Sequence, residues 1–238
     1  MLPIGDPGQG TDDPRRGLGI ATLTFIALLL LVFVFELFLV PGVFFIPAGL
    51  AFVPGALFGA AGMPAGVFAL PPPATLVSYQ LLHAGWPHLL GNLLFLWVFG
   101  PRVEDALGPA RFTVLLIMCG IVAALVQAWP ESSSAVAMLG ASGAISGVLG
   151  AHLCLHPRAR IRMLALQLPA YLVLGAWFAI QFFYANWAAA AGGGIAFRAH
   201  VGGFLAGVLL APVLRYLMLL SAEARTVART PRSRDSRH

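Results

Sequence analysis

The sequence has few charged residues, few cysteines and no lysine. Only 10% of its 238 residues are charged, whereas soluble domains carry about 25%. Together with a mean hydropathy of +0.88, this excludes a soluble globular protein. Cys119 and Cys154 lie in apolar runs, where thiols are expected to be small buried side chains. Two such residues provide neither a disulfide framework nor a zinc site.

Long apolar runs predict an all-α membrane protein, because a helix needs roughly 20 apolar residues to cross a ~30 Å hydrocarbon layer. We expect a disordered cytoplasmic tail over 1–19, one membrane domain over 20–220 and an Arg-rich cytoplasmic tail over 221–238. The first run is too long for a signal-peptide core and is expected to remain as an anchor. Six spans are predicted, at about 20–40, 86–104, 110–129, 140–156, 166–186 and 196–219.

The placement of arginine predicts the orientation of these spans. If the N-terminus is cytoplasmic, thirteen of the fourteen arginines lie on the cytoplasmic side and only Arg198 lies outside, as the positive-inside rule requires. Both termini are therefore expected to be cytoplasmic. The net charge of +5 comes from arginines spread over tails and loops, which argues against a nucleic-acid partner. Without an organelle presequence or a seventh span, a bacterial inner membrane is the expected location.

The loop after the first span is long and apolar. No charged residue occurs between Glu36 and Arg102, whereas a loop in water is normally polar. We expect this loop to lie in the outer membrane interface or to dip into the bilayer. A flexible low-complexity connector is the alternative.

Polar residues within the spans are functional candidates, because they are costly in a bilayer. Ser142 opens the fourth span and His200 opens the sixth, while His83, His88 and Asn92 lie at the outer end of the second. These three spans run in the same direction. Their polar groups are therefore expected to converge at one depth near the outer surface.

Ser142 and His200 can form a nucleophile and its base, because a serine needs an adjacent base such as histidine. Their helices must approach closely, which small residues permit. Gly143 and Gly147 follow Ser142, and Gly203 and Gly207 follow His200, in two GxxxG patterns. We expect Gly140, Gly143 and Gly203 to support the site.

Acyl transfer also needs donors for the developing oxyanion. His88, Asn92 and the backbone N–H of Ser142 are candidates. An interhelical hydrogen bond that holds the bundle together is the alternative role of His88 and Asn92. His83 is expected to brace the outer loop or to cap the second span.

At these residues the sequence resembles the rhomboid family of intramembrane serine proteases. The resemblance runs from about residue 75 to 213 and includes HAGWPHLLGN, VEDALG, GASG and AHVGG in that order. It implies a six-helix bundle without cofactor or metal, in which Ser142 is the nucleophile and His200 the general base. His88 and Asn92 would be oxyanion donors. The substrates would be transmembrane helices of other proteins, cut near their outer end in the lipid bilayer.

The sequence departs from the family pattern in two places. Some members carry an aromatic residue one turn after the nucleophile that stacks on the catalytic histidine, but Ser146 stands there, so another group must orient His200. The first outer loop also lacks the Trp-Arg pair seen in some members. In the family the fifth span gates the entry of substrates to the active site. Here the candidates for such a gate are Trp177, Phe178, Phe182 and Phe183. The alternative is that these aromatic side chains face the lipid.

Other functions have less support in the sequence. There is no HExxH metalloprotease motif and no aspartate in the core of a span. His152 and His156 have metal-ligand spacing but no third ligand, and we expect them to be interfacial side chains. Glu36 could orient His200, or simply reach the outer interface. A non-catalytic relative that binds membrane helices remains the main alternative, and the apolar span cores disfavour a transporter.

Overall fold

The structure is a computed structural model that describes residues 19–39, 49–60, 69–163, 166–191 and 196–229. The expected tail over 1–19 lies, apart from Gly19, outside the described residues. In chain order the elements are α1 (Ile20–Leu39), α2 (Pro54–Leu57), α3 (Pro72–Ser78), η1 (Tyr79–Leu81), α4 (Trp86–Leu107), α5 (Pro109–Ala128), η2 (Trp129–Glu131), α6 (Ser142–Leu155), β1 (Arg160–Met163), β2 (Leu166–Pro169), α7 (Ala170–Ala191) and α8 (Phe197–Arg229).

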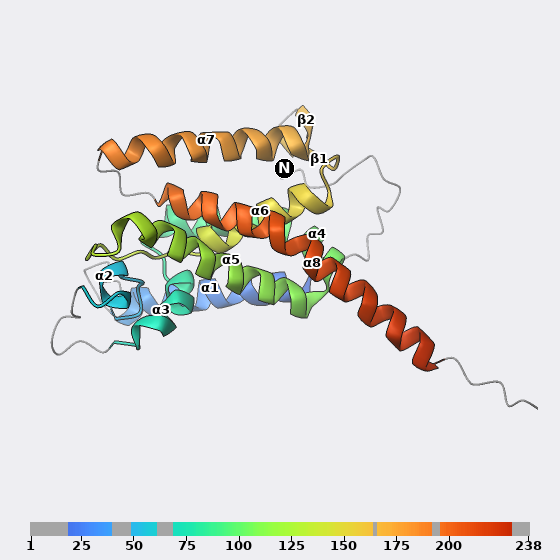
Figure 1. The fold of residues 1–238 in the computed structure, drawn as a ribbon, viewed down its shortest axis with the longest axis horizontal. Helices are drawn as coiled ribbons and strands as arrows, with labels where there is room; N and C mark the ends of the chain where they lie inside the picture. Colours follow the sequence, from blue (N-terminus) through green and yellow to red (C-terminus); the bar gives the residue numbers. More distant parts are fainter. Residues whose placement is uncertain (1–18, 40–48, 61–68, 164–165, 192–195, 230–238) are drawn as a thin grey trace, which may run out of the picture.

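The long helices lie roughly along one axis, and α8 projects beyond the others at one end (Figure 1). We call the end at which α4, α6 and α8 begin the serine end, and the other the opposite end. α2 and α3 lie at the serine end. The predicted spans agree with the helices to within a few residues except in two places. The fifth helix begins only at Ala170, after the short β1–β2 hairpin, and α8 continues to Arg229.

Three of the described helices are long and apolar enough to cross a membrane, over Ile20–Phe38, Pro109–Glu131 and Phe197–Ala222. The apolar parts of α6 and α7 are shorter. At 1.5 Å per residue, the 14 residues of α6 extend only ~21 Å, less than a ~30 Å hydrocarbon layer. The six-span count therefore stays a prediction.

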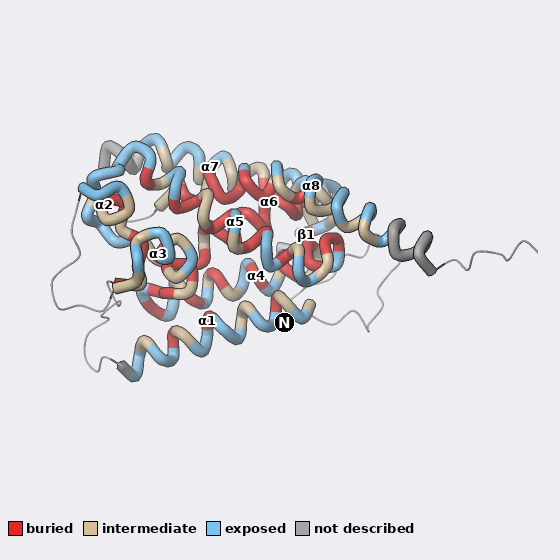
Figure 2. The backbone as a smooth tube through the Cα atoms, turned by 60° about the horizontal axis from the view of Figure 1, so that its bottom comes forward, coloured by how far each residue is buried: buried red, intermediate tan, exposed pale blue. Residues whose placement is uncertain are grey.

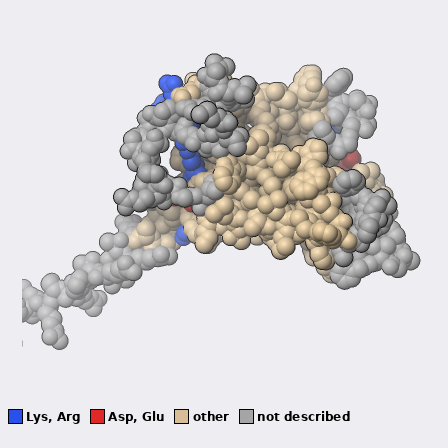
Figure 3. Space-filling view, turned by 180° about the vertical axis from the view of Figure 1, so that it is seen from behind, with Lys and Arg blue, Asp and Glu red and all other residues tan. Residues whose placement is uncertain are grey.

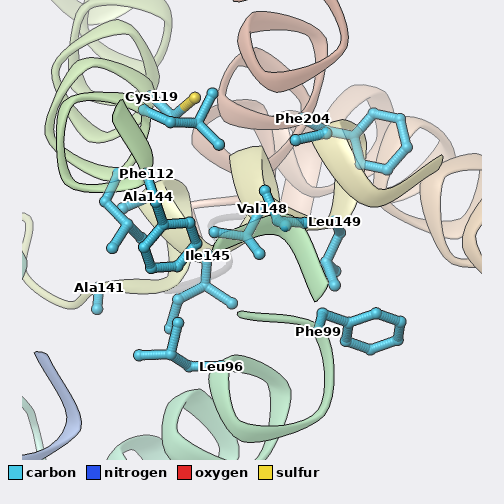
Figure 4. Packing of buried hydrophobic residues seen from close by; sticks show 14 of the residues in the cluster. Leu96, Phe99, Phe112, Cys119, Ala141, Ala144, Ile145, Val148, Leu149 and Phe204 are labelled. Carbon is cyan, nitrogen blue, oxygen red and sulfur yellow. The ribbon is translucent and has the colours of Figure 1, made fainter. Parts of the chain in front are cut away.

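The core of the bundle is built around α6, which is buried at every position from Gly143 to His152. Figure 2 shows this contrast with α1 and α7, whose outer faces are exposed. In Figure 4, side chains of α6 meet those of α4, α5 and α8; the labelled residues include Leu96, Phe99, Phe112, Cys119, Ile145, Val148, Leu149 and Phe204. Many large apolar side chains are exposed on the described helices, and on the face seen in Figure 3 the middle of the molecule is uncharged.

Glycines allow α6 and α8 to pack backbone against backbone. We call Gly143, Gly147, Gly203 and Gly207 the glycine seam. A Cβ atom on Gly203 would overlap the carbonyl of Gly143, and one on Gly207 would overlap the backbone of Gly147. Side chains of any size would therefore push these two helices apart, as the paired GxxxG patterns predicted.

The cysteines differ from their expectation. Cys119 is buried, and its side chain fills the space where a Cβ of Gly147 would lie. Cys154, near the end of α6, is exposed, so the prediction of a buried thiol is wrong there. Cys154 follows Gly143, Gly147 and Gly150 on one helical face, but it lies in the last turn of α6, beyond the buried stretch that ends at His152.

At the opposite end, a buried carboxylate on α4 holds the start of α1. Glu104 accepts hydrogen bonds from the backbone N–H of Ala21 (2.9 Å), and from the N–H and hydroxyl of Thr22 (both 2.8 Å). Anions are favoured at a helix N-terminus, where N–H groups lack partners within the helix. This contact fixes α1 against α4.

The described parts of the first outer loop are folded onto the bundle. Phe52 and Met138 exchange backbone hydrogen bonds of 3.0 and 2.8 Å, and the N–H of Gly55 donates to Ser134 O. These parts therefore do not form a flexible connector. Residues 40–48 and 61–68, the rest of the expected interfacial segment, lie outside the described residues.

Candidate active site

Ser142 and His200 lie together at the serine end of the bundle. Ser142 is the first residue of α6 and His200 lies in the first turn of α8. The hydroxyl Oγ of Ser142 is 2.9 Å from Nε2 of His200, and both residues are half-buried. The glycine seam begins one residue after Ser142 and three after His200, so the close approach of the two helix backbones sets this distance.

A third residue, Gln181 of α7, contacts the other side of the imidazole. Its Oε1 atom is 2.7 Å from Nδ1 of His200. Sequence reasoning missed Gln181, although an amide within an apolar span is itself a signal.

Aromatic rings from α7 and α8 surround the His200 ring. The centroids of Trp177 and Phe197 lie 6.2 and 6.3 Å from it. Trp177 and Phe178 also pack on Phe204. The other two gate candidates, Phe182 and Phe183, are 55% and 65% exposed, as expected of lipid-facing side chains.

The residue one turn after Ser142 does not orient His200. The hydroxyl of Ser146 donates to the carbonyl of Ser142 at 2.6 Å, within α6. The orientation of His200 instead comes from Gln181 and the rings of Trp177 and Phe197.

Asn92 and His88 of α4 lie in the same part of the molecule. Asn92 is buried, and its Nδ2 atom has no hydrogen-bond acceptor among the described residues. A Cβ atom on Gly140 would lie only 2.7 Å from Nε2 of His88, so His88 packs against the turn that precedes Ser142. The unpartnered amide argues against the alternative in which Asn92 serves only to bond helices together.

Glycine is required at position 140 for two reasons. Its φ angle of +116° is unfavourable for other residues, and a side chain would collide with His88. The N–H of Gly140 donates to Tyr79 O at 2.9 Å, and the Tyr79 hydroxyl donates to Gly120 O at 2.7 Å. The turn before Ser142 is therefore fixed by η1 and α5.

His83 braces the loop and does not cap α4, whose N-cap residue is Gly85. Its Nδ1 atom is 3.2 Å from Leu81 O, and its ring lies 5.2 Å from that of His88. Burial, with a further contribution from the neighbouring His88, lowers the pKa of His83 to about 4. His83 is therefore neutral near pH 7.

Neither interpretation of Glu36 fits the structure. Its Oε2 atom accepts the backbone N–H of His83 at 3.3 Å, and its Oε1 atom is buried. Glu36 thus turns inward to the loop and does not orient His200, whose Nδ1 faces Gln181.

The two histidines with metal-ligand spacing, His152 and His156, lie together at the opposite end of the bundle. No cluster of three metal-ligating side chains occurs within the described residues. His152 is buried against Phe99 and His156, with ring centroids at 5.1 and 5.5 Å, so the interfacial interpretation is wrong for His152. The sequence did not show that α4 covers the face of α6 on which His152 lies.

Comparison with known proteins identifies the family. The model of the rhomboid domain matches residues 73–217, which is more than half of the chain. The chain belongs to the rhomboid family. The match contains every residue of this rhomboid site named above except Glu36, and it agrees with the resemblance drawn from the motifs.

Three relatives illustrate the extent of the similarity. Rhomboid protein 1, mitochondrial, of Saccharomyces cerevisiae is 34% identical over 143 residues, 57% of this chain and 40% of the relative. RHOMBOID-like protein 5 of Arabidopsis thaliana is 31% identical over 146 residues, which are 58% of this chain and 43% of the relative. Rhomboid protease GlpG of Yersinia pestis is 32% identical over 136 residues, which are 57% of this chain and 46% of the relative. The aligned parts cover less than half of each relative.

Proposed function

We propose that this rhomboid chain is an intramembrane serine endopeptidase that cleaves transmembrane helices of other proteins near their outer end. The observation that carries the proposal is the 2.9 Å separation of Ser142 Oγ and His200 Nε2. Its support is membership of a family that includes proteins named rhomboid protease.

In the proposed reaction, His200 Nε2 takes the hydroxyl proton of Ser142 as Oγ attacks the scissile carbonyl carbon. The tetrahedral intermediate collapses when His200 gives that proton to the departing amine, which leaves an acyl ester on Ser142. Water then attacks the ester, with His200 as base, and the serine is restored. In the first half of the reaction one proton passes through His200 from Ser142 to the departing amine, and in the second half another passes through His200 from water to Ser142.

The oxyanion of each intermediate needs positioned donors, each of which can contribute ~10²–10³ in rate. We assign this role to the Asn92 amide, the His88 imidazole and the Ser142 N–H. The buried Asn92 Nδ2, which has no acceptor in the described part of the chain, supports the assignment. The first N–H groups of a helix also lack partners within the helix, which favours a contribution from the start of α6.

The experiment is labelling of the purified chain with a serine-directed fluorophosphonate, in detergent and in liposomes. We expect labelling of the wild type but not of the Ser142→Ala or His200→Ala variants. If folded wild-type protein is unlabelled in both environments, a non-catalytic protein that binds membrane helices becomes the better description.

We further propose a bacterial plasma membrane as the location, with both termini cytoplasmic. The arginine distribution supports this orientation. Green fluorescent protein and alkaline phosphatase, each fused after His238, test it in a bacterial host. A fluorescent fusion and an inactive phosphatase are expected; an active phosphatase would reverse the assignment.

A further inference from the structure

The contacts of His200 show which ring nitrogen donates a hydrogen bond and which accepts one. Gln181 Oε1 is a carbonyl oxygen and can only accept a hydrogen bond, so the 2.7 Å contact requires a proton on His200 Nδ1. A neutral imidazole carries one proton. Nε2 therefore holds a lone pair, directed at the Ser142 hydroxyl 2.9 Å away.

We propose that Gln181 is a positioning residue that selects the tautomer of His200 able to act as a base. The inference rests on the proposed function, in which His200 Nε2 accepts the serine proton. The opposite tautomer carries its proton on Nε2 and cannot accept another there. Which nitrogen of a histidine is protonated is generally set by the partner of the other nitrogen.

The placement of Gln181 suits this role. It lies four residues after Trp177 on α7, so both side chains are on one helical face, and both reach His200. The Trp177 contact fixes the plane of the imidazole ring, and the Gln181 contact fixes which nitrogen carries the proton. Ser146 is hydrogen-bonded within α6, and Glu36 accepts a hydrogen bond from the backbone of His83. Neither side chain therefore supplies the contact that orients His200.

An amide also has an advantage over a carboxylate in a bundle surrounded by lipid. A carboxylate would have to remain charged in a medium that penalises charge. Gln181 accepts the Nδ1 proton while staying neutral, and it keeps that bond when His200 becomes an imidazolium during the reaction. The Nδ1 proton never needs to leave, because every proton that is transferred, from Ser142 to the amine and from water to Ser142, passes through Nε2.

Three variants of the full chain in liposomes test the proposal through the rate of fluorophosphonate labelling. Gln181→Met keeps the length of the side chain and removes the amide, whereas Gln181→Glu keeps an oxygen acceptor. Asn186→Met is the matched control, because Asn186 is an exposed amide on the same helix whose Nδ2 atom donates to Phe182 O. Since one neutral hydrogen bond is lost, we expect labelling of Gln181→Met to be about tenfold slower. Gln181→Glu should label faster than Gln181→Met, and the control should match the wild type.

A spectroscopic measurement separates tautomer selection from a general structural effect. In ¹⁵N-histidine-labelled protein, with the His200 signals assigned from the His200→Gln variant, the wild type should show a protonated Nδ1 and an unprotonated Nε2. Gln181→Met should shift the population towards protonated Nε2, and Asn186→Met should not.

Equal labelling of Gln181→Met and the control would overturn the proposal, as would an unchanged His200 tautomer. If the wild type is not labelled, or if labelling survives Ser142→Ala, the proposed function fails instead. The ¹⁵N spectra need no activity, so they still decide whether Gln181 sets the tautomer.

Discussion

The two sides of the imidazole are held by different kinds of contact. On the α6 side, backbone lies against backbone along the glycine seam, and Ser142 is placed relative to His200 by the helix axes. On the α7 side, Gln181, Trp177 and Phe178 reach α8 only through their side chains, and much of α7 is exposed. The distance between nucleophile and base is thus a property of the fold, whereas the orientation of the ring depends on a few replaceable atoms.

The largest expected effect comes from adding one methyl group to the seam. In Gly207→Ala the new Cβ would overlap the backbone of Gly147, which cannot rotate away as a side chain can. We expect a loss of about 3 kcal/mol or more in the free energy of unfolding, measured by denaturant titration in detergent.

The control for that variant is the same substitution, glycine to alanine, on the α7 side. Gly175 lies on α7, and no atom within 4 Å would meet its Cβ. Gly175→Ala should raise the free energy of unfolding by roughly 0.5–1 kcal/mol, because alanine is the better helix former. Equal destabilisation by both changes would remove the distinction between the two sides.

The next effect tests whether the loop at the serine end helps to stabilise the bundle. The pKa of His83 is lowered to about 4 in the folded protein and is about 6.5 when unfolded. The unfolded chain therefore binds more protons between these values, and stability is complete above about pH 6.5 and falls as the pH drops towards 4. We expect about 2 kcal/mol less stability at pH 5 than at pH 7 from this group.

His83→Gln should show a correspondingly weaker loss of stability on acidification, measured by denaturant titration at both pH values. Identical pH dependence in the variant and the wild type would contradict the buried, neutral state of His83.

The smallest effect is expected for the ion pair near the start of α8. Arg198 and Glu131 are 2.9 Å apart, but their side chains are 29% and 47% exposed. Exposed pairs contribute little, so Arg198→Gln should lower the free energy of unfolding by less than about 0.5 kcal/mol. Labelling of Ser142 should stay within about twofold of wild type. A large loss of labelling would mean that this pair, and not the seam, fixes His200.

The sequence predicted the α6 side of the site better than the α7 side. Ser142, His200 and the seam glycines form local patterns whose helical spacing fixes which residues share a face. Gln181 meets His200 only through tertiary packing of α7 on α8, which no local spacing encodes. The β1–β2 hairpin could have been found, because Arg160 and Arg162 alternate with Ile161 and Met163 in the period of a strand. Glu36 and His152 were misplaced because hydropathy gives the depth of a residue but not the direction of its side chain.

The two thiols, one enclosed and one exposed, make the packing of α5 beside the seam measurable without any substrate. Cys119 fills the space beside Gly147, whereas Cys154 lies exposed near the end of the same helix that begins with Ser142. A thiol reagent can reach Cys119 only when the packing around it opens, so its rate of reaction reports the free energy of that local opening. Cys154 supplies the reference for an unprotected thiol. The wild-type chain is thus its own reporter of how often the packing of α5 on α6, the helix that begins with Ser142, opens.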